Sequence, residues 1–169
     1  MNISVTRLDA LISKVERIES GLEPRIKAIQ EKLAELGASE ARMRFGDAVY
    51  DGTNDVEVSV AWKDENTIVV SATGRSVLFI EFGTGVTYSD PHPQAEEFGM
   101  IRGGYGQGKG KNPSWTYYGE PGTNGQFVTS GLKGDVYRTS GNPANRCMYE
   151  AGQKMREEII RAVKEVFKP

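Results

Sequence analysis

Three side chains in this sequence have the chemistry that an active site or a metal site would use: Glu81, His92 and Cys147. Glu81 stands between Ile80 and Phe82, where burial could keep its carboxyl protonated and make it a general acid. His92 is the only imidazole in the chain and Cys147 the only thiol. A Ser-His-Asp triad or a zinc site would therefore have to use them.

None of these candidates has a supporting residue in the sequence. A metal would need further His or Cys ligands, and glycosidase chemistry would need a second carboxylate. We therefore expect His92 to be a solvent-exposed loop residue and Cys147 to be a small buried hydrophobe. Glu81 is expected to point away from the core, or to pair with a backbone amide or an Arg and fix the turn at Gly83. The sequence predicts no catalytic residue, no metal ligand and no cofactor.

A glycine-rich stretch resembles part of a phosphate-binding loop. Gly103, Gly108 and Lys109 match the pattern G-x-x-x-x-G-K. The pattern then fails, because Gly110 replaces the Ser or Thr that holds magnesium and Pro113 prevents a helix from following at once. We expect a flexible loop without a bound nucleotide.

Composition limits the remaining classes. The chain has 169 residues, 38% of them hydrophobic, and its 21 Lys and Arg against 23 Asp and Glu give a net charge of −2. These values are typical of one globular domain and argue against bulk electrostatic binding to nucleic acid. No apolar run is long enough for a membrane span, and we expect no signal peptide. A single Cys excludes an internal disulfide, so a reducing cytosol is the expected setting.

The first region, residues 1–50, is predicted to be a helical arm. Its apolar residues recur at intervals of three and four, which places them on one helix face. They include Leu8, Leu11, Ile12, Val15, Ile18, Leu22, Ile26, Ile29, Leu33 and Leu36. Because proline suits a first turn and harms a helix interior, we expect two helices that meet near residues 21–24. A further turn after Gly37 should direct Ala41, Phe45 and Val49 inward.

The second region, residues 55–82, is predicted to be a β-hairpin and a following strand. Val56, Val58, Val60 and Trp62 alternate with polar or small residues, as in a strand with one buried face. A polar turn at 63–66 and a β-branched run at 67–72 complete the hairpin. Residues 77–82 are apolar and are expected to form a short strand that ends at Gly83 and Gly85.

The third region, residues 83–141, is rich in glycine and is predicted to be a long loop that becomes ordered in part on a neighbour. Its aromatic side chains could stack on bases or contact another protein, and the overall charge favours protein contacts. The candidates for partner contact are Trp115, Tyr117, Tyr118 and Phe127.

The last region, residues 142–167, is predicted to be a helix with Asn142 as its N-cap and Pro143 in its first turn. The whole chain is therefore expected to be one α+β domain, residues 1–169. The last helix and part of the N-terminal helices should cover one face of a small, mainly antiparallel sheet.

The run Phe79-Ile80-Glu81-Phe82-Gly83-Thr84-Gly85 follows the hairpin and precedes the long loop and the last helix. In this order it resembles the tail-completion, or head–tail joining, proteins of the neck of long-tailed bacteriophages. The likeness extends over nearly the whole chain. It marks Phe79, Glu81, Phe82, Gly83, Thr84 and Gly85 as a structural turn motif.

The resemblance implies a structural virion protein without catalysis, assembled in the cytoplasm of a host bacterium. Its subunits would form a homo-oligomeric ring, a hexamer in that family, which caps the tail and joins it to the head. The implied partners are neighbouring neck, tail-terminator or connector proteins, with neither a membrane nor a specific nucleic-acid sequence. Two other functions stay open on the residues alone. One is a nucleic-acid-binding module that uses the aromatic, glycine-rich loop, and the other, less favoured, is a small hydrolase that uses Glu81.

Overall fold

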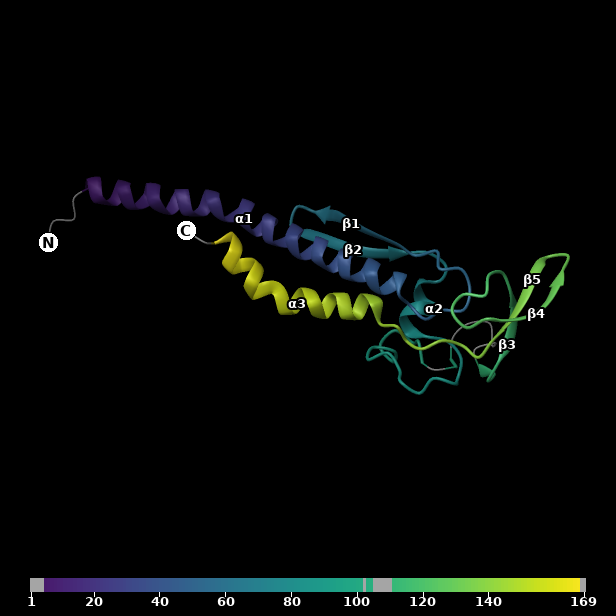
Figure 1. Ribbon diagram of the computed structural model, residues 1–169. Helices are drawn as coiled ribbons and strands as arrows, with labels where there is room; N and C mark the ends of the chain where they lie inside the picture. The colour runs from purple at the N-terminus through teal and green to yellow at the C-terminus, as the bar shows by residue number, and fades with distance from the viewer. Residues whose placement is uncertain (1–4, 102, 105–110, 168–169) are drawn as a thin grey trace.

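The computed structural model describes residues 5–101, 103–104 and 111–167, and it has an α+β fold (Figure 1). Its helices are α1 (Val5–Gly46), α2 (Val77–Phe82) and α3 (Cys147–Val166). Its strands are β1 (Glu57–Asp64), β2 (Thr67–Thr73), β3 (Trp115–Tyr118), β4 (Gln126–Gly131) and β5 (Gly134–Thr139). The strands form two antiparallel sheets, β1–β2 and β3–β5–β4, where the sequence predicted one.

Helix α1 is one helix of 42 residues, so the predicted break near residues 21–24 is wrong. Pro24 lies inside it, and the helix continues as a single rod (Figure 1). A proline in a helix interior removes one backbone hydrogen bond and costs about 3 kcal/mol. The second half of α1, after Pro24, lies between the hairpin and α3.

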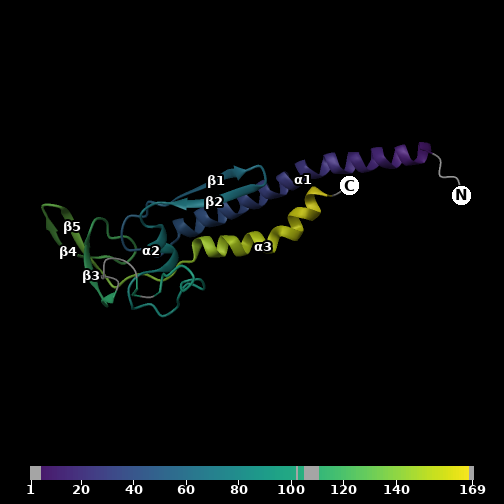
Figure 2. The same ribbon diagram turned by 180° about the vertical axis from the view of Figure 1, so that it is seen from behind.

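The hairpin, α1 and α3 form three layers. Strands β1 and β2 pack on one side of α1, and α3 packs on another side (Figures 1 and 2). The expected cover of the hairpin by the N-terminal helical region is confirmed, and Cys147 and Ala151 of α3 belong to the core against which Val58 and Ala72 pack. Small residues bring the two long helices together, because a β-carbon at Gly37 would collide with the side chain of Met155. Lys32 of α1 and Glu165 of α3 form an ion pair across the same interface.

The buried core lies where α1, α2 and α3 meet. It consists of Ala41, Phe45, Ile80, Cys147 and Ala151, with partly buried side chains from the hairpin packed against it. The predicted inward positions Ala41 and Phe45 are confirmed, although both belong to α1 itself.

The hairpin predicted from alternating residues is confirmed, with Val58 opposite Ala72 and Val60 opposite Val70. Val58 and Val60 are half-buried, whereas Trp62 is 38% exposed.

Residues 77–82 form helix α2, so the predicted third strand is wrong. A short apolar run has the same composition in a buried strand and in a buried helix, and periodicity cannot separate the two. The burial pattern agrees with the helix, because the successive residues Ile80 and Glu81 are both buried. In a half-buried strand they would point to opposite faces.

Residues 83–141 are not one long loop, because the sheet β3–β5–β4 folds within them. This sheet forms the end of the molecule opposite the N-terminus (Figure 1). Asp51 attaches it to the helical body, since its carboxylate accepts hydrogen bonds from the Asn124 amide at 2.8 Å and the Thr139 hydroxyl at 2.5 Å. The Thr123 amide donates to the carbonyl of Tyr50 at 2.8 Å.

In the part of the chain that the structure describes, neither of the two long helices combines the length and apolar character that a membrane span requires.

Candidate functional site

The carboxylate of Glu81 caps the N-terminus of α3. Its Oε2 accepts a hydrogen bond from the Met148 amide at 2.8 Å, and its Oε1 accepts one from the Tyr149 amide at 2.9 Å. The first amides of a helix have no partners within it, and the positive end of the helix dipole favours a negative charge there. The expected pairing of Glu81 with backbone amides is confirmed, but the amides belong to α3 and not to the turn at Gly83.

His92 is buried next to this carboxylate, so the expected solvent exposure is wrong. Its Nε2 lies 3.1 Å from Oε1 of Glu81, and its Nδ1 accepts the Gln94 amide at 3.0 Å. Because Nδ1 is an acceptor, the ring proton sits on Nε2 and is donated to Glu81. The ring packs against Phe82 and Tyr149 at centroid distances of 4.4 and 5.3 Å.

The turn after α2 is a close approach of two backbone segments. Gly83 has φ 76°, and a β-carbon there would lie 2.7 Å from the nitrogen of Ala144 and 2.8 Å from the carbonyl oxygen of Asn142. Gly85 has φ 78°. Only glycine adopts such conformations readily. The special backbone conformations predicted at Gly83 and Gly85 are therefore confirmed, at the end of a helix and not of a strand.

Asn142 does not cap the last helix, because α3 begins at Cys147. Its Oδ1 instead accepts a hydrogen bond from the Thr84 hydroxyl at 2.6 Å, and its Nδ2 donates to the carbonyl of Phe79 at 2.9 Å. Asn145 bonds the carbonyls of Val49 and Ile80 through its Nδ2. Residues 79–85 thus hold the segment that leads into α3.

This cluster has little room for a substrate. Both oxygens of Glu81 already accept hydrogen bonds. The cavity beside His92 measures about 30 Å³, enough for one or two water molecules. Among the described residues, no three His, Cys, Asp or Glu side chains are grouped as a metal site needs. The arrangement is suited to holding α2, α3 and residues 90–95 together.

Cys147 is fully buried in the first turn of α3, as expected. Burial, followed by the nearby Glu81 charge, raises the pKa of its thiol to about 12. A thiol in this environment stays protonated at neutral pH and is a poor nucleophile.

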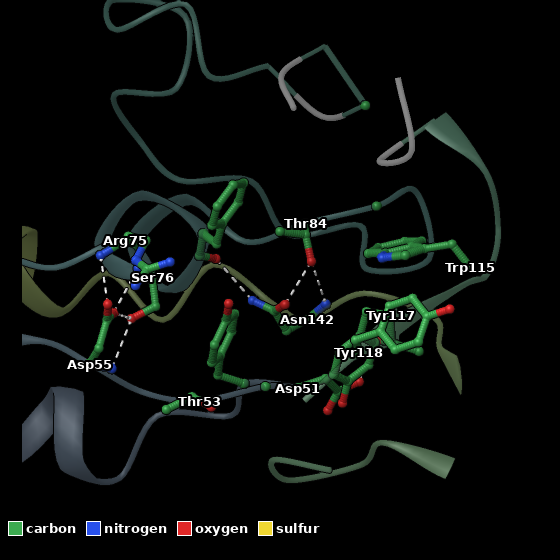
Figure 3. Close-up of a pocket in the computed structure, with 16 residues that line it drawn as sticks. Asp51, Thr53, Asp55, Arg75, Ser76, Thr84, Trp115, Tyr117, Tyr118 and Asn142 are labelled. Atoms are coloured by element: carbon green, nitrogen blue, oxygen red, sulfur yellow. Dashed lines mark hydrogen bonds between the residues drawn. The ribbon is translucent and has the colours of Figure 1, made fainter. Parts of the chain in front are cut away.

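The large cavity of the molecule lies elsewhere, between α2, the loop after α1 and the three-stranded sheet (Figure 3). Its volume is about 590 Å³, within the range of pockets that hold ligands. The aromatic side chains of Tyr50, Phe79, Trp115, Tyr117 and Tyr118 line it, together with Thr53, Asp51 and Asp55. Three of the four predicted contact residues therefore meet at one cavity. The fourth, Phe127, lies outside the lining and is 60% exposed on β4.

Acidic side chains dominate the charge of this cavity. Asp51 and Asp55 line it, and Arg75 is the one basic residue among the described lining residues. Desolvation raises the pKa of Tyr50, with the charges of Asp55 and Asp51 next in effect. Desolvation and then Asp51 raise the pKa of Tyr117 to about 12.

Asp55 is held by the turn before α2. Its carboxylate accepts the Ser76 hydroxyl at 2.5 Å and the backbone amides of Arg75 and Ser76 at 3.0 and 2.9 Å. These bonds lower its pKa to about 2, with the Ser76 hydroxyl the largest cause. The roles of Asp51 and Asp55 do not follow from the sequence, since no local pattern links either residue to its distant partners.

The residues that matched a phosphate-binding loop are only partly described. Gly103 borders the large cavity. Gly108, Lys109 and Gly110 lie outside the described residues.

Comparison with known proteins identifies no relative: the chain matches no protein-family model, no curated protein and no solved structure. The likeness of residues 79–85 to phage neck proteins therefore stays a prediction from the sequence. What the chain does has to be argued from its own geometry.

Proposed function

We propose that this chain is a structural subunit of a bacteriophage neck, a tail-completion protein that joins the tail to the head as a homo-oligomeric ring. The observation that carries this proposal is the projecting arm formed by the first half of α1. The arm extends beyond the end of α3 in both views (Figures 1 and 2). A projecting helix with solvent-exposed apolar residues is suited to contact with another protein chain and not to a monomeric protein.

The apolar residues of the arm keep large exposed fractions. They are Leu11 at 59%, Ile12 at 47%, Val15 at 55%, Leu22 at 42% and Ile26 at 45%. Leu11, Val15, Leu22 and Ile26 recur at intervals of four and seven, so they form one stripe along the helix. In the proposed ring this stripe packs on neighbouring subunits, and the sheet edges provide further contacts.

The opposite end of the molecule supplies the surface for other neck, tail-terminator or connector proteins. Tyr118 and Phe127 are 61% and 60% exposed there. Exposed aromatic residues favour protein contacts. Asp51 and Asp55 next to the aromatic side chains disfavour a nucleic-acid phosphate in the cavity.

The proposed role is non-enzymatic. Its support is the use of Glu81 and His92 in holding the N-terminus of α3, described above. The competing hydrolase hypothesis requires turnover that depends on Glu81. A measurable hydrolytic activity that disappears in Glu81→Gln, with the fold retained, would overturn the proposal.

Labelling of purified virions tests the location directly. Gold-tagged antibodies against the chain should bind at the junction of head and tail in electron micrographs. Labelling along the tail shaft, on the capsid or nowhere on the particle would contradict the neck assignment.

The aromatic end is tested with the double variant Trp115→Ala and Tyr118→Ala. Because both side chains lie outside the buried core, the variant should fold. It should nonetheless leave heads and tails unjoined. The matched control is Met43→Ala, which truncates an exposed side chain of α1 that does not line the cavity. Normal particles from the double variant would contradict the proposed role of the aromatic end in joining heads to tails.

A further inference from the structure

The tip of the β4–β5 hairpin projects beyond the sheet that carries it. Strand β3 ends opposite Val136, whereas β4 and β5 continue as a pair to Gly131 and Gly134. Leu132 and Lys133 form the turn between them, at the end of the molecule away from the helices (Figure 1). Leu132 has a relative exposure of 110%, the largest of the exposed apolar residues in the described chain.

This tip has a defined shape. The Ser130 hydroxyl donates to the carboxylate of Asp135 at 2.7 Å, directly across the hairpin below the turn. The hydrogen bond engages the acidic group at the base of the tip. Leu132 and the ammonium group of Lys133 lie at the outer end of the tip, beyond the Asp135 carboxylate.

The large cavity has the complementary properties. Its aromatic walls accept an apolar side chain, and its volume of about 590 Å³ accommodates more than one. Asp51 and Asp55 give it an excess of negative charge over Arg75. Glu120 adds a further carboxylate nearby, 3.4 Å from the hydroxyl of the lining residue Thr53. A cation next to aromatic rings and carboxylates is stabilised by both.

We propose that the Leu132-Lys133 tip of one subunit inserts into the aromatic, acidic cavity of a second copy of this chain. The tip cannot occupy the cavity of its own subunit in this structure, because Leu132 is fully exposed. A projection that fits a recess elsewhere on an identical chain makes a head-to-tail contact, and such contacts form a ring when the rotation between neighbours closes and an open filament when it does not. The inference rests on the proposed ring, and it assigns two of the ring's facing surfaces.

Cysteine cross-linking between two populations of the full-length chain tests the contact. One population carries Leu132→Cys and the other Thr53→Cys, a lining residue with an exposed side chain. The native Cys147 is buried and takes no part. After oxidation with diamide, the mixture should give a disulfide-linked dimer of unlike subunits. Substituting Met43→Cys for Leu132→Cys, at an exposed site outside the cavity lining, should give none.

Self-association measured by sedimentation provides the second readout. Leu132→Gln combined with Lys133→Glu should weaken association of the full-length chain about tenfold or more. Met43→Gln removes an exposed apolar side chain elsewhere and should leave it unchanged. Lys133→Arg keeps the charge and should retain association.

The outcomes separate this inference from the proposed function. If the chain associates equally well with the tip variant and no unlike dimer forms, the tip contact is wrong although the ring stands. The contact is equally wrong if the unlike dimer forms with Met43→Cys as readily as with Leu132→Cys. If the predicted cross-link forms but antibodies do not label the head–tail junction, the contact is right and the neck assignment is wrong.

Discussion

Oε1 of Glu81 and Nε2 of His92 lie 3.1 Å apart in the interior of the protein, and the same carboxylate binds two amides of α3. Both side chains are buried. One acidic group thus connects α2, the loop that carries His92, and the start of the last helix. A buried charge is stabilised by several hydrogen-bond donors. If that charge is lost, the hydrogen bonds that these donors make become weaker.

Replacing Glu81 with Gln should therefore destabilise the protein by about 1–3 kcal/mol, because the amide keeps the size but loses the charge that caps α3. Urea unfolding followed by circular dichroism measures the change. Glu57→Gln on the exposed face of β1 is the control and should shift stability by less than about 0.5 kcal/mol. Equal stability of the two variants would show that Glu81 does not hold the helix.

Gly83 and Gly99 provide a matched pair for the turn after α2, since both have positive φ. Gly99 has nothing within 4 Å of the position that a β-carbon would take, whereas Gly83 faces the backbone of residues 142–144. Gly99→Ala should cost only the conformational penalty of about 1–2 kcal/mol. Gly83→Ala should cost more than about 2 kcal/mol, and Gly83→Val at least as much. A smaller loss at Gly83 than at Gly99 would contradict the close approach.

The thiol of Cys147 should not react with Ellman's reagent at neutral pH in the folded protein. Its side chain is fully buried, and burial raises its pKa to about 12. In urea the same thiol should react fully within the mixing time of an ordinary assay. Rapid, complete reaction of the native chain would place Cys147 at an accessible site.

Asp55 should make stability depend on acid pH. Its pKa falls from 3.8 to about 2 in the folded chain, chiefly through the Ser76 hydroxyl. The folded state therefore binds this proton less readily than the unfolded state. The stabilisation is complete above the ordinary pKa of 3.8 and is lost as pH falls toward about 2. Unfolding midpoints measured across this range should drop less steeply for Asp55→Asn than for the parent chain, and parallel curves would contradict the assignment.

Local patterns predicted much of the secondary structure. Alternation at Val58 and Val60 identified the hairpin, and the buried positions Ala41 and Phe45 followed from helical spacing. Both the strand alternation and the helical spacing repeat along the chain, so they can be recognised without knowledge of the tertiary structure. The backbone conformations of Gly83 and Gly85 could be predicted for a different reason. Two small residues at the end of an apolar run indicate an unusual backbone conformation.

The errors arose where distant contacts decide the structure. Pro24 lies inside a continuous α1 whose later residues pack between the hairpin and α3. His92 is buried because Glu81 and Tyr149 surround it, and its immediate neighbours in the sequence carry no sign of that environment. Asn142 has the residue type of a helix cap but bonds Thr84 across 58 positions. The large cavity could not be predicted from the sequence for the same reason, since its lining residues Tyr50, Phe79 and Trp115 come from separate parts of the chain.

The most direct test of the central claim is electron microscopy of a lysate from phage in which a stop codon silences the gene for this chain. A neck subunit is required after heads and tails have been built separately. We expect filled or closed heads and free tails in the same field, with joined particles restored when the chain is supplied from a plasmid. Complete, joined and infectious particles in the absence of the chain would contradict it.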